Sequence, residues 1–265
     1  MPYTLGKPIT SIPNLMNEIE KFVGTDPMED VYLRGQVDFS WGLLPVIGRK
    51  LRYVRIETKG YDNELEGRLL HQFRRYARAH PEGNVDEREI LLLARHHGVP
   101  VRLLDWTSNP LVALYYACVD GDDENLDKDG AIWMFMRKTH LKREHYYDIY
   151  NPEEKSILKL KGVRIIYSPH VTSRITAQSG HFTTQDNPAI GIEDYLPPKG
   201  RNARTFDIKK LKKWRIPHAT KVKFIEELQR CGINERALFP DLDGIARSIV
   251  RTEVLRSQHG GKKRR

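Results

Sequence analysis

The stretch HHGVPVRLLDWTSNPLVALYYAC, residues 96–118, constrains the fold more than any other segment of the chain. Asn109 and Pro110 form a typical helix start, because a capping residue is followed by proline at the first helical position. The residues that follow, 111–119, carry no charge. A helix without charges is buried on most of its sides, so its N-terminus should point at a specific place in the structure.

The segment before this helix has the pattern of a short strand. Pro100 ends a preceding helix, and VRLLDW then alternates so that Arg102 and Trp106 share one face while Asp105 lies on the other. The stretch therefore predicts a strand that runs into a buried helix through a polar corner.

This corner has two interpretations. In the first, free backbone N–H groups at the helix start and the Thr107 and Ser108 hydroxyls bind an anion. Trp106 would then supply a stacking face, and Arg102 a bidentate donor for phosphate or carboxylate. In the second, Arg102 and Asp105 form a structural ion pair beneath the helix, and no ligand is involved.

The remaining elements are mixed along the chain without a regular alternation of helix and strand. This order favours an α+β fold, a single mixed domain with a central, partly antiparallel sheet flanked by helices. Hydrophobic spacing and turn residues predict helices at 12–23, 65–80, 87–97, 218–232 and 242–255, and strands at 31–35, 130–137 and 162–169. We divide the chain into an N-terminal arm (1–24), one domain (25–255) and a basic disordered tail (256–265).

The chain carries a formal net charge of +9, which makes an anionic partner plausible. Part of this charge lies in KKLKKWR, residues 209–215, where an aromatic residue interrupts the cations. Cations that hold phosphates beside a ring that stacks on bases are typical of nucleic-acid binding, although a solvated surface explains the same pattern. The candidate nucleic-acid-binding residues are Lys209, Lys210, Lys212, Lys213 and Trp214.

Other features narrow the class of protein. Cys118 and Cys231 match no zinc or redox spacing, so we expect both to be reduced in a cytoplasmic protein. No window has the apolar length of a membrane span, so no membrane partner is expected. The histidines have no metal-site spacing, and the motifs GxxxxGK[ST], GxSxG and GxGxxG are absent, so no metal is expected either.

Four blocks resemble the FRG domain family in this order: VYLRGQVDFSWGLLPVIGR, HHGVPVRLLDWTSNPLVALYYAC, SRITAQSGHFTTQ and LQRCGINERALFPDLDGIA. The resemblance runs from about Val31 to Ala246. Three residues depart from the family pattern: Leu33 stands in place of an aromatic, Arg95 in place of glutamine, and Val101 in place of threonine. The resemblance does not by itself imply an activity, but domains of this family occur in bacteria and phages, sometimes near defence genes.

A second resemblance is to the three-part layout of ADP-ribosyltransferases, which implies NAD as a substrate and a toxin or antiviral effector as a role. Arg34 corresponds to the first-strand arginine that holds the NAD pyrophosphate, and Thr107 with Ser108 to the Ser/Thr motif. RITAQ predicts a strand that brings Gln178 to the place of the late glutamate. Glutamine can bind a ribose hydroxyl but cannot act as a base. Glu193 is a candidate replacement carboxylate.

These resemblances give two residue sets. The candidate catalytic residues are Arg34, Ser108, Gln178 and Glu193, and the candidate cofactor-binding residues are Arg34, Gln36, Arg102, Asp105, Trp106, Thr107 and Ser108.

Three hypotheses of function follow. The chain is an ADP-ribosyltransferase-like or NAD-consuming enzyme, a non-catalytic nucleotide- or nucleic-acid-binding module, or a structural interaction domain. The first two require the candidate residues to line one cleft.

Overall fold

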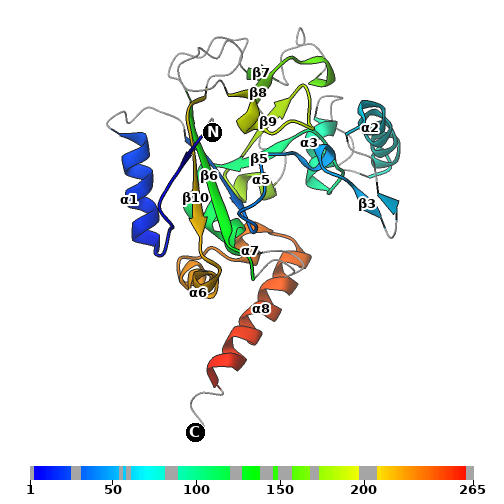
Figure 1. Cartoon of the computed structure of the whole chain (residues 1–265). Helices are drawn as coiled ribbons and strands as arrows, with labels where there is room; N and C mark the ends of the chain where they lie inside the picture. Colours follow the sequence, from blue (N-terminus) through cyan, green and yellow to red (C-terminus); the bar gives the residue numbers. More distant parts are fainter. Residues whose placement is uncertain are drawn as a thin grey trace.

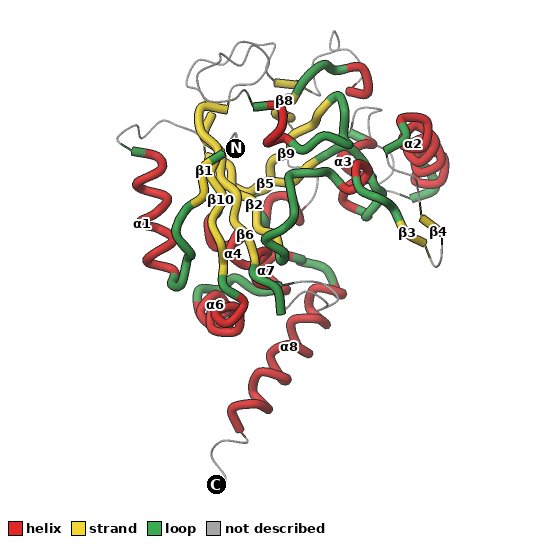
Figure 2. The backbone as a smooth tube through the Cα atoms, viewed as in Figure 1, coloured by secondary structure: helices red, strands yellow, loops and turns green. Residues whose placement is uncertain are grey.

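The computed structural model describes residues 3–24, 31–53, 56–57, 61–80, 89–119, 127–137, 146–148, 157–167, 173–196 and 208–260. Within these ranges, helices surround one large mixed sheet (Figures 1 and 2). The predicted α+β class, with a central and partly antiparallel sheet in a single domain, is confirmed.

The main sheet has eight strands in the order β1-β10-β6-β2-β5-β9-β8-β7. Neighbouring strands are antiparallel except at the two edges, where β1 pairs with β10 and β7 with β8 in parallel. A separate pair is formed by β3 (Arg52–Tyr53) and β4 (Ile56–Glu57). The strands of the main sheet are β1 (Thr4–Leu5), β2 (Val31–Gln36), β5 (Leu104–Thr107), β6 (Gly130–Arg137), β7 (Tyr146–Asp148), β8 (Val163–Tyr167), β9 (Gly180–Gln185) and β10 (Ile208–Ile216).

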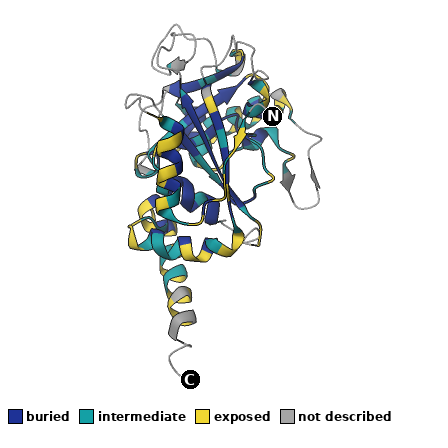
Figure 3. Ribbon diagram, turned by 60° about the vertical axis from the view of Figure 1, so that its left-hand side comes forward, coloured by how far each residue is buried: buried dark blue, intermediate teal, exposed yellow. Residues whose placement is uncertain are grey.

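The α-helices of the described ranges are α1 (Ile12–Val23), α2 (Asn63–Ala77), α3 (Ile90–His96), α4 (Pro110–Cys118), α5 (Ser173–Ala177), α6 (Lys221–Arg230), α7 (Glu235–Leu238) and α8 (Leu242–Gly260). Helices α1, α4 and α6 contribute to one apolar core against β2, β6 and β10. Figure 3 shows the buried strands between helices whose outer faces are exposed. Helix α8 extends away from the rest of the domain (Figure 1).

Strand β6 shows why the central strands are apolar on both faces. Its alternate residues enter two different cores, with Ile132 and Met134 on the side of α4 and Trp133 and Phe135 on the opposite side. A strand that is covered on both faces reads as a continuous apolar run, as GAIWMFMR does.

The glycine of the Arg-Gly pair in β2 allows close packing of α4. A Cβ atom at Gly35 would lie 1.9 Å from the carbonyl oxygen of Ala113, and one at Gly130 would lie 2.2 Å from that of Ala117. Only glycine permits this approach of helix backbone to strand backbone. The close contact fixes the N-terminus of α4 beside β2 and β5.

Both ends of the chain add to this framework. The segment predicted as an arm supplies β1, which pairs with β10, and α1, which occupies the predicted range and buries Leu15 in the core. Helix α8 continues to Gly260, so the first residues of the predicted tail are helical. The last five residues of the tail, 261–265, lie outside the described residues.

Candidate functional site

A cavity of about 330 Å³ lies among β2, β5, α3, α4 and α5. One part of its wall is apolar, formed mainly by Leu33, Leu92, Trp106, Val112, Ile175 and Phe182. The other part is polar and consists of Arg34, Arg95, His96, Asp105, Thr107, Tyr116, Arg174 and Gln178. Small-ligand sites commonly combine an apolar wall with converging polar groups, and in this cavity the polar side chains outnumber the large apolar ones.

Arg34 enters the cavity where two strands separate. β2 and β5 pair only through Leu33 and Thr107. Beyond this pair, Nη1 of Arg34 donates to the backbone carbonyl of Asp105 at 2.8 Å, so the guanidinium satisfies an acceptor that a continued ladder would have used. Nε of Arg34 is buried and has no hydrogen-bond partner among the described residues.

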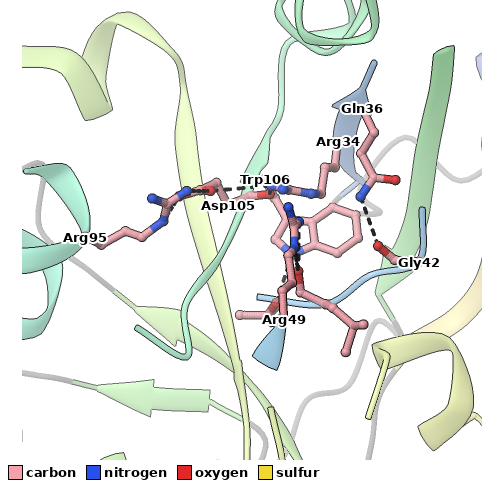
Figure 4. A network of polar contacts seen from close by, with 9 residues as sticks. Arg34, Gln36, Gly42, Arg49, Arg95, Asp105 and Trp106 are labelled. Atoms are coloured by element: carbon pink, nitrogen blue, oxygen red, sulfur yellow. Dashed lines mark hydrogen bonds and ion pairs between the residues drawn. The ribbon is translucent and has the colours of Figure 1, made fainter. Parts of the chain in front are cut away.

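Asp105 is shared between two arginines (Figure 4). Arg95 binds it in bidentate fashion, with Nε 3.1 Å from Oδ1 and Nη2 2.5 Å from Oδ2, and Nη1 of Arg34 lies 3.4 Å from Oδ2. Burial alone would raise the pKa of Asp105, but the charges of Arg95 and Arg34 outweigh it and hold the pKa below its ordinary value. Asp105 is therefore ionised at neutral pH.

The cavity carries more positive than negative charge. Arg34, Arg95 and Arg174 line it, and Asp105 is the one carboxylate among its described lining residues. Burial lowers the pKa of Arg34 to about 10, with a contribution from the nearby charges of Arg49 and Arg95, but the side chain stays protonated at neutral pH. The field inside the cavity therefore favours an anion.

The third arginine is oriented by aromatic residues. The guanidinium of Arg174 lies 4.2 Å from the ring centroid of Phe239, a cation–π contact. Tyr116 also faces this part of the cavity, and burial raises its pKa to about 12. Its hydroxyl group is thus neutral and can donate a hydrogen bond to a bound anion.

Arg102 does not reach the cavity. Its side chain is 1% exposed and bonds Glu66, which is 0% exposed, with Nη2 and Nε at 2.7 and 3.0 Å from Oε2. Tyr61 completes this cluster, because its hydroxyl accepts from Nη2 of Arg102 at 2.8 Å. The predicted ligand contact of Arg102 is not formed, and the alternative pairing with Asp105 is wrong, because Glu66 is the partner.

The polar corner before α4 is largely satisfied internally. Thr107 donates through Oγ1 to the carbonyl of Gln178 at 2.7 Å, and Asn109 caps the helix by accepting from the backbone N–H of Leu111 at 2.9 Å. Ser108 is exposed and does not line the cavity. The described bonds thus give the N-terminus of α4 a structural role.

The third predicted element has a different form. Residues 173–177 form α5, so the prediction of a strand through RITAQ was wrong. Ser179 then has a left-handed φ of 47°, and β9 starts at Gly180. Gln178 nevertheless lines the cavity, and its Nε2 donates to the carbonyl of Leu238 at 3.0 Å.

Two other candidates have structural partners outside the cavity. The carboxylate of Glu193 accepts from the backbone N–H of Leu43 at 3.0 and 3.1 Å, and burial raises its pKa. Gln36 is 3% exposed and bridges Trp133 and Gly42.

Trp106 forms a wall of the cavity and is 3% exposed. Its Nε1 donates to Thr183, and its ring packs edge-on against Phe135. Little of the ring is left for the predicted stacking on a ligand.

The basic stretch KKLKKWR forms most of β10, and its described side chains are already engaged. Lys210 donates to the carbonyl of Phe22 at 3.0 Å, and Lys212 pairs with Glu18 at 3.2 Å. Lys213 is 4% exposed, and burial lowers its pKa to about 8. Trp214 is 0% exposed, so it cannot stack on a base. Of Lys209 only the backbone is described.

Four polar residues of the cavity were missed by the sequence argument: Arg95, His96, Tyr116 and Arg174. Arg95 departs from the family pattern, and this departure marked the position that binds Asp105. Arg174 belongs to a block assigned to the family, but the expected strand directed attention to Gln178. Tyr116 stands in the charge-free helix, where an aromatic residue looks like core. Among the described residues, no three His, Cys, Asp or Glu side chains gather as metal ligands.

Comparison with known families agrees with the first two of the four blocks identified above, whereas the blocks at 173–185 and 228–246 lie outside the matched residues. Residues 29–126 match the FRG domain family. The chain therefore contains an FRG domain, and this region supplies Arg34, Arg95, Asp105 and Tyr116 of the cavity, whereas Arg174 and Gln178 come from the sequence after it. No curated protein and no solved structure matches the chain. No helix within the described ranges has the length and apolarity needed to cross a membrane.

Proposed function

We propose that the cavity binds a small phosphate-bearing ligand of nucleotide type. The observation that carries this proposal is the Arg34–Asp105–Arg95 cluster, in which two arginines share one carboxylate at the wall of a cavity. An arginine that is only partly neutralised keeps donors for a second anion, and its planar fork suits phosphate. Arg174 adds a third cation to the polar wall.

The apolar wall indicates what else the ligand carries. Leu33, Ile175 and Phe182 face the same space as the arginines, so a phosphate alone would leave apolar surface uncovered. A volume of about 330 Å³ is at the small end of the range for ligand pockets. A ligand with a ring at one end and phosphate at the other matches both parts of the wall.

NAD is one ligand of this type, but the arrangement supports binding better than transfer. Cleavage of the glycosidic bond is assisted by a carboxylate that stabilises the positive transition state. Asp105 is the one carboxylate among the described lining residues, and two arginines neutralise it. The amide group of Gln178 donates to a main-chain carbonyl and has no negative charge to offer. These contacts favour the non-catalytic nucleotide-binding hypothesis.

The test is calorimetric titration with NAD, ADP-ribose, ATP and inorganic phosphate, alongside an assay of nicotinamide release from NAD. We expect one or more of the nucleotides to bind more tightly than phosphate. Arg34→Ala should weaken that binding by about 10- to 100-fold, since charge-assisted hydrogen bonds contribute roughly 1.5–3 kcal/mol. Arg34→Lys should also be impaired because an ammonium group lacks the planar fork.

Arg68→Ala is the matched control, because it removes an arginine that is 61% exposed on α2. It should leave binding unchanged, and thermal unfolding of all variants verifies that they fold. Failure of the wild type to bind any of these probes would refute the proposal. Nicotinamide release that depends on Arg34 would restore the enzymatic hypothesis.

A further inference from the structure

Helix α8 exposes an apolar surface that is unusual for a folded domain. It extends away from the sheet and the other helices (Figure 1), and five large apolar side chains on it are exposed to solvent. Leu242 is 83% exposed and Val250 63% exposed. We call this set the outer face of α8; it consists of Leu242, Ile245, Ile249, Val250 and Val254. Contiguous apolar patches on soluble domains commonly mark sites of protein–protein contact.

The spacing of these residues is that of a helix face that packs against a core. Leu242, Ile245, Ala246, Ile249 and Val250 follow the pattern i, i+3, i+4, i+7, i+8, which forms one continuous stripe. The stripe does not face the domain to which α8 belongs. A face with this pattern is expected to be covered by another element.

The contacts of α8 with its own domain are made by its other side. Arg251 forms an ion pair with Glu235 of α7, and Thr252 accepts a hydrogen bond from Gln229 of α6 at 3.1 Å. Gly244 packs closely against Phe239. These contacts fix the orientation of α8, so its outer face is presented to solvent.

We propose that the outer face of α8 packs against the same face of a second copy of the chain, with the two helices antiparallel. The charges along the helix support this arrangement. Asp241 and Asp243 stand at the N-terminal end, whereas Arg256 stands near the C-terminal end and is 72% exposed. An antiparallel pair places Arg256 of each copy near the acidic end of the other and also aligns the helix dipoles favourably.

The same charges disfavour an anionic membrane as the occupant. Arg251 is bound to Glu235, and the guanidinium of Arg247 lies 5.1 Å from the ring centroid of Phe239. Arg256 is paired with Glu253 at 2.7 Å, and that carboxylate lies at i+11, where it ends the apolar stripe with a negative charge. Helices that lie on membranes combine an apolar face with lysines and arginines on the polar face that are available to lipid. Arg247 and Arg251 are thus held against the domain, which leaves Arg256 as the one described arginine beside the outer face, whereas a membrane-binding helix needs several.

The size of the surface predicts the strength of the contact. A helix of 19 residues is about 28 Å long, so it offers several turns for packing but less area than a standard interface. We therefore expect a dimer in reversible exchange with the monomer. Its dissociation constant should lie in the micromolar range, which is roughly the level typical of small interfaces.

Sedimentation equilibrium of the full chain from about 1 to 100 µM tests this, since the range brackets a micromolar dissociation constant. The wild type should pass from monomer to dimer as concentration rises. Ile249→Glu should remain monomeric because it places a carboxylate in the middle of the outer face. The control is Val222→Glu, which changes a 56% exposed valine on α6 and should dimerise like the wild type.

A charge exchange tests the antiparallel direction. Asp243→Lys and Arg256→Glu should each weaken the dimer, because each replaces attraction between the copies by repulsion. A mixture of the two single variants, or the double variant, should recover it by restoring opposite charges at both ends. Circular dichroism verifies that α8 stays helical.

A wild type that stays monomeric over the whole concentration range would overturn the proposal. A dimer that Ile249→Glu leaves intact would overturn it equally. Co-sedimentation of a monomeric wild type with phosphatidylserine-containing vesicles, lost in Ile249→Glu, would instead assign the outer face to a membrane.

Discussion

Two arginines of this chain bind carboxylates in opposite surroundings. Arg102 and Glu66 are a one-to-one pair, both buried, with Tyr61 as a further partner. Arg34 shares Asp105 with a second arginine, Arg95, and the side chain of Asp105 is 39% exposed. The first cluster is a closed structural pair, whereas the second has an excess of positive charge beside a cavity.

The difference shows that an arginine near an aspartate does not define a site. A site is defined instead by the number of arginines for each carboxylate and by whether hydrogen-bond donors remain available to a ligand. A balanced pair that excludes water gains nothing from a further anion, because its charges are already neutralised. An unbalanced cluster at a cavity lowers the energy of any anion that enters.

The largest expected effect that separates the two clusters is on stability. Glu66→Gln leaves the charge of Arg102 buried without compensation, which costs roughly 3–5 kcal/mol of unfolding free energy. The variant should unfold at much lower urea concentration than the wild type. If it keeps wild-type stability, the closed character of this cluster is refuted.

Because Arg102 does not line the cavity, ligand affinity should not change in the fraction of Glu66→Gln that is folded. Titration at a temperature where the variant is still folded checks this second outcome. A variant that is folded but does not bind would place Arg102 back in the ligand site.

Asp105→Asn makes the same chemical change in the other cluster and should have a smaller effect on stability. Two arginines lose their carboxylate, but water reaches the site, so we expect a loss of about 1–2 kcal/mol. Pyrophosphate should bind more tightly, by about tenfold, because a negative charge beside the arginines is removed. Calorimetry measures the affinity of the wild type and of Asp105→Asn for pyrophosphate. Weaker binding would instead show that Asp105 contacts the ligand itself.

Local pattern was sufficient to predict several elements. The helix at 12–23 and the strand at 130–137 have the predicted bounds, because each depends on a hydrophobic period within its own residues. β10 was missed because its lysines looked like a solvated surface. Their ammonium groups reach main-chain carbonyls and Glu18 of other segments, which the sequence around them does not reveal.

The candidate site was predicted only in part, because some of its residues are identified by local pattern and others only by contacts with distant segments. Arg34, Asp105, Thr107 and Gln178 do line one cavity, although they come from different parts of the sequence. Arg102 was assigned to it because the alternation of VRLLDW places Arg102 on the same strand face as Trp106, beside the polar corner. Its partner, Glu66, is 36 residues upstream in α2, and no local pattern connects the two. The separation of the two clusters therefore depends on tertiary structure.

The smallest expected effect is on the pH dependence of stability. Burial tends to raise the pKa of Asp105, but the charges of Arg95 and Arg34 lower it by more. The pKa in the folded state therefore lies below that in the unfolded state. A carboxylate with a lowered folded pKa contributes stability above its unfolded pKa, about 4, and this contribution is lost as the pH falls through the folded value. The difference in unfolding free energy between wild type and Asp105→Asn should therefore be constant from about pH 7 to 5 and shrink below about pH 4. Because the side chain is 39% exposed, the change should be at most about 1 kcal/mol.

Urea unfolding of the wild type and Asp105→Asn across this pH range measures the change. Glu64→Gln is the control, since that carboxylate is 86% exposed in a surface pair. A difference that grows towards acid pH would contradict the sharing of Asp105 by two arginines, because it would mean that Asp105 is less acidic in the folded protein than in the unfolded chain.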